Sequence, residues 1–543
     1  MNTAQMLVKC LEQEGVKVVF GIPGEENLEV VEALSASEIR FITTRHEQGA
    51  AFMADVYGRL TGRAGVCLAT LGPGATNLIT GVADANSDGA PLVAITGQVS
   101  TERMHITGHQ YLDLGKIFEP VTKRTKMIMQ PDTVCEVVRL AFKYAQSDKM
   151  GATHIDLPVD IAGMEVPKGE QPLTKREPPV EYADLESIAA AAKLLSQARN
   201  PVMLVGADAA RAGISKAVTE IAHILRIPVV NTMMAKGVIP CNDPYSMWTI
   251  GIPQRDYQDL IIRDADLLLA VGYDIVELAP SRLNPNKDKA IIHLNTVPAH
   301  VNRFYPPAAE VVGDMGDALR RLAQFCKRET EPEEAIAIRE RMTKEHEETS
   351  ADDSFPLKPQ RILMEARRAL SAGDILISDV GAHKMWIARH YNCYEPNSCI
   401  ISNGFATMGI AVPGALAARL VRPDKKVLAV TGDGGFMMNM QELETGKREH
   451  LPFVTLIFGD SAYGLIAWKQ QDRYGHTNYT SFSNPDYAMM AESMGCKGYR
   501  VRSAEQLQSA LADAFAQDVP AVIDCPVDYS ENMRLEKRLA GLA

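Results

Sequence analysis

The feature that most constrains this chain is the alternation of short apolar runs, rich in β-branched residues, with stretches of helical pattern. In the first third, the apolar runs cover residues 16–24, 65–74, 91–97 and 154–159, and most of them close on glycine. Helical stretches such as Glu47–Thr61 and Ala75–Asn86 lie between them. Strands that are apolar throughout are typical of parallel sheets covered by helices on both faces. The sequence therefore predicts an α/β fold built on doubly wound parallel sheets.

The same alternation returns twice more along the chain. The later apolar runs cover residues 201–206, 228–233, 266–272, 290–295, 375–381, 426–435, 452–458 and 521–527. At roughly 100–200 residues per domain, a chain of this length has room for three domains. We expect them at residues 1–165, 183–327 and 355–543. The linkers are expected at 166–182, which is polar and contains proline, and at 328–354, which is highly charged and predicted to hold an exposed helix.

Charge and cysteine content exclude several classes of function. The net charge is −12 and no block of Lys or Arg offsets it, so we expect neither a nucleic-acid partner nor a membrane surface. No run of about 18 apolar residues predicts a membrane span, and the first residues lack the apolar segment of a signal peptide. The nine cysteines are scattered and form no C-x-x-C pair. Reduced thiols in a cytoplasmic protein are the expectation.

The strongest local signal is a glycine-rich turn that follows the strand ending at Val430. Gly432, Asp433, Gly434 and Gly435 come next, before a helical stretch. Glycines let backbone amides approach a phosphate, and a carboxylate such as Asp433 is a ligand that Mg²⁺ prefers. Taken alone, the motif also fits an ordinary Asp-Gly turn.

A second carboxylate strengthens the magnesium interpretation. Asp460 follows the apolar run 452–458, and one helical stretch separates this run from the strand before Asp433. Parallel strands joined by one helix bring their carboxyl ends together, where ligands bind in such sheets. Asp433 and Asp460 could therefore reach one ion, helped by the carbonyl of Ala462. The alternative is that Asp460 caps the helix that starts near Tyr463.

Other candidate residues also lie at strand ends. Glu47 follows the short strand FITT, at the start of a helix made of small residues, where its carboxylate could serve in acid–base chemistry or simply favour the helix dipole. The segments GPGATN (72–77) and SNGFATMG (402–409) could approach a ligand closely or form tight turns. Met408 in the second segment also fits an ordinary core position.

Together and in order, these motifs resemble the thiamine diphosphate-dependent enzymes over nearly the whole chain. The motifs are GIPG (21–24), RHE (45–47), GPGATN (72–77), SNGFATMG (402–409) and GDGG (432–435), followed by Asp460. Within that family the chain most resembles acetolactate synthases, and is closer to their catabolic, FAD-free branch than to the biosynthetic branch. The segments that carry this closer resemblance are 109–113, 118–123, 271–280, 401–413 and 526–532.

The resemblance implies a role for each domain and two cofactors, thiamine diphosphate and Mg²⁺, with FAD not expected. The first domain would be the pyrimidine-binding domain and the third the diphosphate-binding domain. Glu47 would relay protons at the cofactor's pyrimidine ring, Asp433, Asp460 and the Ala462 carbonyl would hold the metal, and Met408 would support the bent cofactor. Further cofactor contacts are implied for Pro73, Asn77, Gly381, Ala382, His383, Thr407, Gly432, Gly434, Gly435, Tyr463, Gly464, Leu465 and Ile466.

Substrate contacts follow from the same resemblance. The backbone of Gly24 would approach the reacting carbonyl, and Gln110, Phe118 and Lys123 match positions near the active-site entrance. Gly24, Gln110 and Lys123 join Glu47 as the candidate catalytic residues. Trp468 would line the substrate pocket or belong to the core or an interface. It and Gly464 are closer to the biosynthetic branch, and Glu25 and Glu26 replace small and basic residues, so the acceptor substrate stays open.

The resemblance implies carboligation: pyruvate, a small 2-oxo acid, loses CO₂ and the fragment joins a second pyruvate to give 2-acetolactate. One alternative is a decarboxylase that releases an aldehyde, which the lack of a His-His dipeptide disfavours. Another is a ligand-binding homologue without catalysis, which the intact Glu47, Asp433 and Asp460 argue against. A dinucleotide-dependent oxidoreductase would need a G-x-G-x-x-G turn after the first strand. In this family the glutamate and the diphosphate motif come from different chains, so a homodimer is the minimal unit expected, and a homotetramer the expected assembly.

Overall fold

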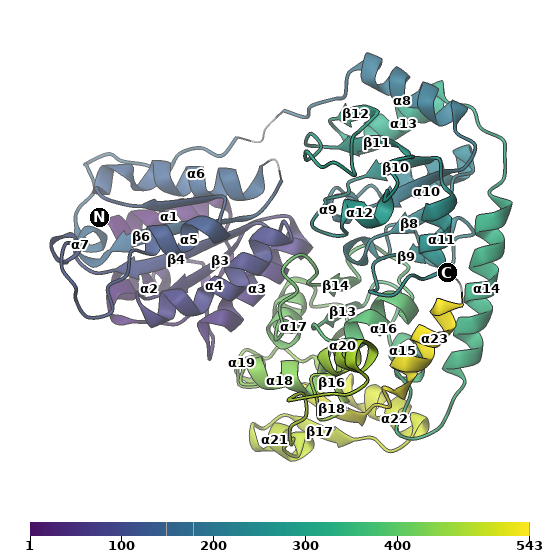
Figure 1. Cartoon of the computed structure of the whole chain (residues 1–543). Helices are drawn as coiled ribbons and strands as arrows, with labels where there is room; N and C mark the ends of the chain where they lie inside the picture. The colour runs from purple at the N-terminus through teal and green to yellow at the C-terminus, as the bar shows by residue number, and fades with distance from the viewer. Residues whose placement is uncertain (148, 177–178, 542–543) are drawn as a thin grey trace.

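Three parallel six-stranded sheets make up the protein, as the computed structural model of residues 1–147, 149–176 and 179–541 shows (Figure 1). All strand pairings inside each sheet are parallel. The prediction of three doubly wound α/β units is therefore confirmed. Residues 177–178 of the expected linker 166–182, residue 148 of the first expected domain and residues 542–543 of the third lie outside the described residues.

The first sheet has the strand order β2-β1-β3-β4-β6-β5. Its strands are β1 (Val18–Gly21), β2 (Arg40–Thr43), β3 (Gly65–Ala69), β4 (Leu92–Gln98), β5 (Arg124–Met127) and β6 (Ala152–Pro158). Its helices are α1 (Thr3–Glu14), α2 (Leu28–Ser35), α3 (Glu47–Thr61), α4 (Pro73–Ser87), α5 (Leu114–Phe118), α6 (Val134–Gln146) and α7 (Val159–Gly163). Strands β3, β4 and β6 are buried along their whole length, which explains their unbroken apolar sequences.

The middle sheet has a different order, β12-β11-β10-β7-β8-β9. Its strands are β7 (Pro201–Val205), β8 (Val229–Asn231), β9 (Ser246–Thr249), β10 (Leu267–Val271), β11 (Ala290–Asn295) and β12 (Ala309–Val312). Its helices are α8 (Leu185–Gln197), α9 (Ala207–Arg211), α10 (Ser215–Leu225), α11 (Tyr257–Asp264), α12 (Pro280–Leu283) and α13 (Met315–Phe325). The charged stretch that follows forms α14 (Glu333–Ser350), the long helix at the edge of Figure 1. Ala335, Ile338 and Met342 on α14 are buried in the middle domain's core, so this segment is more than an exposed connection.

The third sheet repeats the order of the first, β14-β13-β15-β16-β18-β17. Its strands are β13 (Ile375–Ser378), β14 (Cys399–Ile401), β15 (Val427–Gly432), β16 (Val454–Gly459), β17 (Lys497–Arg500) and β18 (Ala521–Pro526). Its helices are α15 (Pro359–Ala369), α16 (Ala382–His390), α17 (Ala411–Val421), α18 (Asp433–Asn439), α19 (Glu442–Arg448), α20 (Gly464–Tyr474), α21 (Tyr487–Ser493), α22 (Ala504–Ala514) and α23 (Ser530–Ala540).

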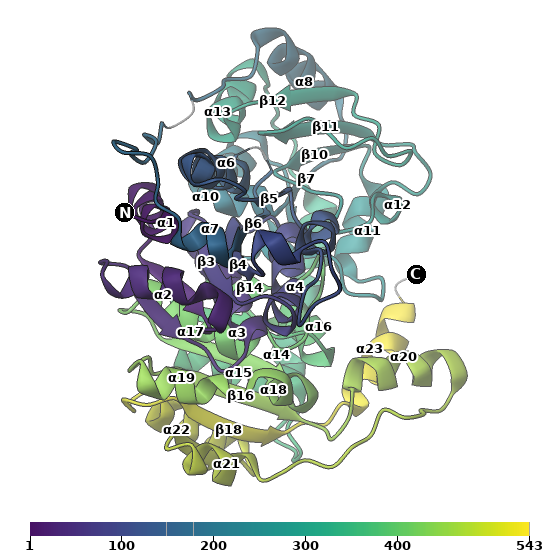
Figure 2. The ribbon, with the colours of Figure 1, turned by 90° about the vertical axis from the view of Figure 1, so that its left-hand side faces the viewer.

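The first and third domains share one hydrophobic core. Helix α3 packs on α17, and Figure 2 shows both where the purple and green parts of the chain meet. Ala50, Ala54, Ala411 and Ala415 are fully buried in this shared core. Small side chains on both helices allow their backbones to approach closely, so the first and third domains are held together within one chain. None of the helices in the described residues is long and apolar enough to cross a bilayer.

Candidate functional site

A cavity of about 160 Å³ opens at the carboxyl edge of the third sheet. It lies between the turns that follow β15 and β16, the start of α16 and the segment before α23. Its lining includes the predicted residues Gly381, Ala382, His383, Met408, Gly432, Asp433, Gly434, Gly435, Asp460, Ala462, Tyr463, Gly464, Leu465 and Ile466. The motifs at 381–383, 408, 432–435 and 460–466 therefore converge on one site.

Asp433 and Asp460 stand side by side in this cavity. Asp433 is almost fully buried, and its Oδ2 accepts hydrogen bonds from the backbone amides of Asp460 (3.1 Å) and Ser461 (2.6 Å) and from the side chain of Asn484 (2.8 Å). Burial and the charge of Asp433 raise the pKa of Asp460 to about 7. Two carboxylates crowded in this way favour a divalent cation, and oxygen donors suit Mg²⁺.

Two further polar groups in the cavity make no hydrogen bond within the described chain: His383 Nε2 and the Tyr529 hydroxyl are both buried there. Burial lowers the pKa of His383 to about 3 and raises the pKa of Tyr529 well above its usual value. The imidazole is therefore neutral and the phenol keeps its proton. Buried polar groups without partners are rare, and here they point to a polar ligand.

The glycines of the site leave space that side chains would fill. A Cβ on Gly434 would lie 2.8 Å from the Tyr463 ring, and one on Gly464 would lie 2.5 Å from Asp460 Oδ2. These glycines, the paired carboxylates and the two groups without partners fit a diphosphate held by Mg²⁺. Asp433, Asp460 and the carbonyl of Ala462 would hold the metal, while His383 and Tyr529 could contact the phosphates.

The loop that carries Met408 is held from both sides. Asp379 accepts hydrogen bonds from the backbone amides of Gly409 and Ala411, and burial raises the pKa of Asp379 to about 6. Thr407 donates through its hydroxyl to Asp84 of the first domain at 2.8 Å, so its side chain is directed toward that domain. Met408 is half-buried and lines the cavity. Both domains thus fix the position of this methionine.

Asp84 belongs to a buried ionic cluster that joins the first domain to this loop. Arg59 pairs with Asp55, Asp84 and Asp88 at 2.7–3.0 Å, and all four side chains are nearly inaccessible. Asp88 accepts from the backbone amides of Asn403 (3.0 Å) and Gly404 (2.5 Å). Burying a charge destabilises the fold unless the charge is paired and hydrogen-bonded. Removing one member of the cluster would leave an uncompensated buried charge and destabilise the protein. The cluster therefore fixes the 402–409 loop.

Glu47 lies in a separate group at the carboxyl edge of the first sheet. Its carboxylate accepts a hydrogen bond from Asn77 Nδ2 at 3.0 Å and is half-buried. A Cβ on Gly74, which follows Pro73 in the same turn, would lie 3.3 Å from Glu47 Oε1. Gln110 has a positive φ of 56° and packs against Gly72, at the start of that turn. Glu47, Pro73, Asn77 and Gln110 are therefore brought together.

Gly24 lies at the same sheet edge as Glu47. A Cβ on Gly24 would come within 2.6 Å of the Thr70 side chain, so the backbone passes very close to the end of β3. Thr70 in turn donates to Glu26 at 2.6 Å. None of the described residues that line the third domain's cavity comes from the first domain. Within one chain, the residues around Glu47 and those around the Asp433 cavity therefore form two separate groups.

Three predicted residues, Lys123, Phe118 and Trp468, lie outside both groups. Lys123 Nζ donates to the carbonyl of Tyr144 in the last turn of α6 and to those of Ser147 and Lys149 just past it, so its ammonium holds the end of this helix. Phe118 is fully buried and stacks on His154. Trp468 is buried in the third domain's core and does not line the cavity. Within one chain none of these three residues lines the cavity, and their assignment to substrate contacts stays a prediction.

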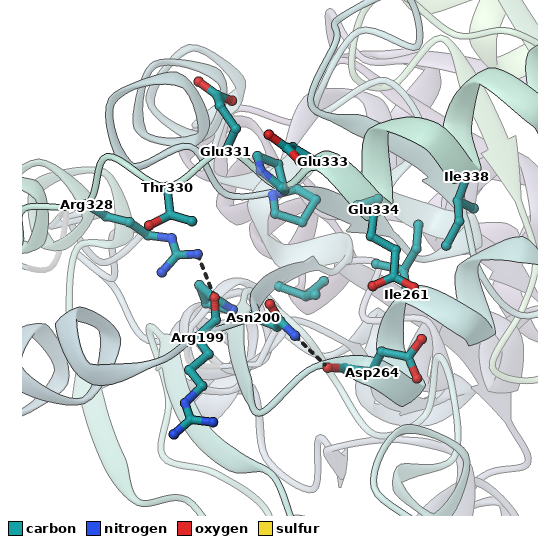
Figure 3. Close-up of a pocket in the computed structure, with 15 residues that line it drawn as sticks. Arg199, Asn200, Ile261, Asp264, Arg328, Thr330, Glu331, Glu333, Glu334 and Ile338 are labelled. Carbon is teal, nitrogen blue, oxygen red and sulfur yellow. Dashed lines mark hydrogen bonds between the residues drawn. The ribbon is translucent and has the colours of Figure 1, made fainter.

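A larger cavity, of about 440 Å³, lies far from these turns, where β7 begins and α14 starts (Figure 3). Arg328 crosses it to donate to the carbonyls of Ala198 and Arg199. Asn200 and Glu334 also line it. It opens at the amino edge of the middle sheet, opposite to the carboxyl edge where ligands of parallel sheets bind.

The middle sheet has the strand order 3-2-1-4-5-6 that is common in dinucleotide-binding proteins, and its switch point lies between β7 and β10. In proteins with this strand order the phosphates lie at the start of the helix after the first strand, which here is α9, and Glu277 lies at that point. Its carboxylate accepts from the Ala207 amide, at the start of α9, and from the Thr232 hydroxyl. Burial raises the pKa of Glu277 to about 7.

Sequence signals for the residues that we missed were weak. Asn484 lies in a loop without a motif, and Tyr529 follows the last strand within a segment that we had noted only for its resemblance. Asp379 directly follows β13, and a carboxylate at the end of a parallel strand could have been taken as a site residue. Asp84 sits inside α4, where nothing local indicates a role.

Three sequence-family descriptions match the chain in order. They are the N-terminal thiamine pyrophosphate-binding domain (residues 1–117), the central domain of thiamine pyrophosphate enzymes (188–322) and their C-terminal thiamine pyrophosphate-binding domain (379–525). Thiamine pyrophosphate is another name for thiamine diphosphate.

Whole-length relatives match as well. An acetolactate synthase of Bacillus subtilis is 36% identical over 98% of this chain and 94% of the relative. A catabolic acetolactate synthase of Raoultella terrigena is 35% identical over 99% of this chain and 97% of the relative. The large subunit of acetolactate synthase isozyme 2 of Escherichia coli is 32% identical over 98% of this chain and 97% of the relative.

Proposed function

This chain belongs to the thiamine diphosphate-dependent enzymes related to acetolactate synthases, and on that premise we propose that it decarboxylates pyruvate and joins the fragment to a second pyruvate, giving 2-acetolactate and CO₂. The observation that carries this proposal is the cavity in which Asp433 and Asp460 meet, together with Glu47 at the first sheet's edge. The names of the relatives support carboligation over simple decarboxylation.

Bound thiamine diphosphate supplies a nucleophilic carbon that adds to the 2-oxo acid and accepts the electrons left when CO₂ departs. The protein's own residues bind and orient. Asp433, Asp460 and the Ala462 carbonyl would hold Mg²⁺ beside the diphosphate, and His383 Nε2, which has no hydrogen-bond partner in the described chain, would donate to a phosphate oxygen. Met408 supports the cofactor, since its loop is fixed by Asp379 and by the first domain. Glu47 would hold and return a proton at the pyrimidine N1′ of the bound cofactor.

We propose that Glu47 and Asp433 of one functional site come from two chains. No described first-domain residue lines the cavity of its own chain, which supports this arrangement. Met437 and Met438 on α18 are 44% and 42% exposed beside the site, and large exposed apolar side chains of this kind suit an interface. A homodimer is then the minimal unit, and a homotetramer is the assembly that we propose.

We also propose that the protein works without FAD, as in the catabolic branch, because Glu277 fills the anion position of the middle sheet. Purified protein should show no flavin absorbance band and release no flavin on denaturation. A stoichiometric flavin in either measurement would refute this part of the proposal.

One assay tests the proposed reaction directly. Purified protein is incubated with thiamine diphosphate, Mg²⁺ and pyruvate, and the products are separated into acetolactate and acetaldehyde. Acetolactate as the main product is expected. Acetaldehyde alone would identify a decarboxylase, and the absence of pyruvate consumption by cofactor-loaded protein would refute both activities.

A further inference from the structure

The turn that carries Glu47 is bonded to the third domain of the same chain. The backbone amides of Arg45 and His46 donate to Glu442 Oε1 at 3.0 and 3.1 Å. Glu442 is fully buried at the start of α19, and its other oxygen accepts from the Thr445 hydroxyl at 2.6 Å. Both carboxylate oxygens are thus in use, and two of their three donors belong to the two residues before Glu47.

The residues that follow Glu47 are tied to the same part of the third domain. Asn439 Nδ2 donates to Gln48 Oε1 at 2.9 Å, and it also donates to the carbonyl of Gly409. A Cβ on Gly49 would lie 2.7 Å from Glu442 Oε1, so the first turn of α3 rests directly on this carboxylate. Glu442 on α19 therefore holds the backbone before Glu47, and Asn439 on α18 holds the Gln48 side chain after it, while the Glu47 carboxylate itself accepts from Asn77.

Burying the Glu442 carboxylate costs free energy of folding, so its hydrogen bonds to the turn at residues 45–46 need an explanation. Glu442 is ionisable at a site where an apolar side chain would pack with less cost, and burial raises its pKa to about 7. The amides of Arg45 and His46 precede helix α3, which begins at Glu47 with His46 as its N-cap, so the helix offers them no partner. Glu442 supplies that partner from another domain.

We propose that Glu442 is a positioning residue for Glu47: it fixes the turn at 45–46 and thereby the direction in which Glu47 meets the cofactor. The proposal rests on the proposed role of Glu47. Glu442 also lies only nine residues after Asp433, so an effect on the metal site at the other end of α18 is the competing explanation. The hydrogen bonds favour the Glu47 turn.

Point variants of Glu442 distinguish an effect on the Glu47 turn from an effect on the metal site. Glu442→Ala should leave thiamine diphosphate affinity, measured by calorimetry with Mg²⁺, within about twofold and lower kcat by roughly 100-fold, the size of effect that a 1 Å misplacement produces. Glu442→Gln keeps a carbonyl oxygen for both amides and should restore most of kcat. In protein without cofactor, deuterium uptake of a peptide spanning residues 43–50 should rise in the Ala variant and not in the Gln variant.

Thr445→Val is a milder variant in case Glu442→Ala does not fold. It removes the hydroxyl that orients the second carboxylate oxygen, so a smaller loss of kcat at unchanged cofactor affinity is expected. The proposal is overturned if cofactor affinity falls in step with kcat, if Gln is as damaging as Ala, or if deuterium uptake over 43–50 is unchanged. These exchange and binding measurements hold whatever the substrate, so failure of the proposed reaction is seen separately.

Mixed dimers give an independent test of which residue Glu442 serves. If each site takes Glu47 from one chain and Asp433 from the other, dimers of Glu47→Gln and Asp433→Ala chains keep one intact site. Glu442→Ala chains should then recover activity with Asp433→Ala chains and not with Glu47→Gln chains. The reverse pattern would place Glu442 with the metal site and overturn the proposal. Failure of the reference pair alone would refute the two-chain site and leave the single-chain measurements to decide on Glu442.

Discussion

The backbone amide of Asp460 donates a hydrogen bond to Asp433 Oδ2 at 3.1 Å, which joins the ends of two neighbouring strands, β15 and β16. Oδ2 also accepts from Ser461 and Asn484, whereas among the described residues Asp433 Oδ1 accepts only from the adjacent Gly434. The protein thus orients the Asp433 carboxylate through one oxygen and leaves the other open to the cavity. This arrangement suits a metal ligand better than a helix cap.

Asp433→Ala should therefore weaken binding of thiamine diphosphate in the presence of Mg²⁺. Mutating a residue that only hydrogen-bonds to a metal ligand lowers metal affinity by roughly 10–100-fold. Mutating a direct ligand should therefore lower affinity by at least that much. Calorimetric titration measures it, with Asp518→Asn, an exposed change, as the matched control. Unchanged affinity in the Asp433 variant would contradict the metal site.

Glu47→Gln should separate binding from turnover. Gln keeps the size of the side chain and its acceptor for Asn77 but cannot carry a proton between the cofactor and the protein. We expect thiamine diphosphate affinity within about twofold of the wild type, with kcat lower by roughly 10²–10⁴-fold, the range of general acid–base effects. The exposed Glu32→Gln serves as control. Full turnover in the Glu47 variant would rule out its role as proton relay.

The sequence predicted sheet interiors better than sheet edges. The predicted apolar runs contain β1, β3, β4 and β6 in the first sheet and the corresponding four central strands of the other two sheets, while the edge strands other than β2 were not predicted. An edge strand pairs on one side only and needs less apolar surface. Strand β17, Lys497–Arg500, is partly exposed and begins and ends on charged residues, and β5 begins on Arg124. Such strands form because a neighbour pairs with them, and their own sequences hardly show it.

The site divides in the same way between local and long-range information. Asp433, Gly434 and Asp460 could be predicted because each lies just after a strand end, which is a local pattern. Glu442, Asp84 and Tyr529 act across domains or from a distant loop, and no spacing in the sequence links Glu442 to Arg45 or Asp84 to Thr407. Trp468 and Lys123 were assigned by resemblance alone. Within the chain, Trp468 packs in the third domain's core and Lys123 donates hydrogen bonds to backbone carbonyls.

Glu277 should make stability depend on pH. Burial raises its pKa from 4.5 to about 7, so the folded chain holds this proton more tightly than the unfolded chain. Its stabilising contribution is complete below pH 4.5 and is lost as pH rises through about 7, by at most about 3 kcal/mol. Glu277→Gln, which cannot ionise, should therefore show a smaller fall in thermal midpoint between pH 5 and pH 8 than the wild type. The exposed Glu186→Gln should behave as wild type, and an equal fall in the Glu277 variant would contradict this assignment.

Tyr529 offers the sharpest test of the polar groups that lack a partner in the cavity. Its hydroxyl is buried, stays protonated and makes no hydrogen bond in the described chain, so a phosphate oxygen would be its first acceptor. A hydrogen bond to a charged group contributes about 1.5–3 kcal/mol, so Tyr529→Phe should lower thiamine diphosphate affinity by roughly tenfold or more. Tyr499→Phe removes a hydroxyl that bonds Asp513 on the surface and should leave that affinity unchanged. If the two phenylalanine variants bind the cofactor equally well, the Tyr529 hydroxyl does not contact the diphosphate, and the buried group must be satisfied by water instead.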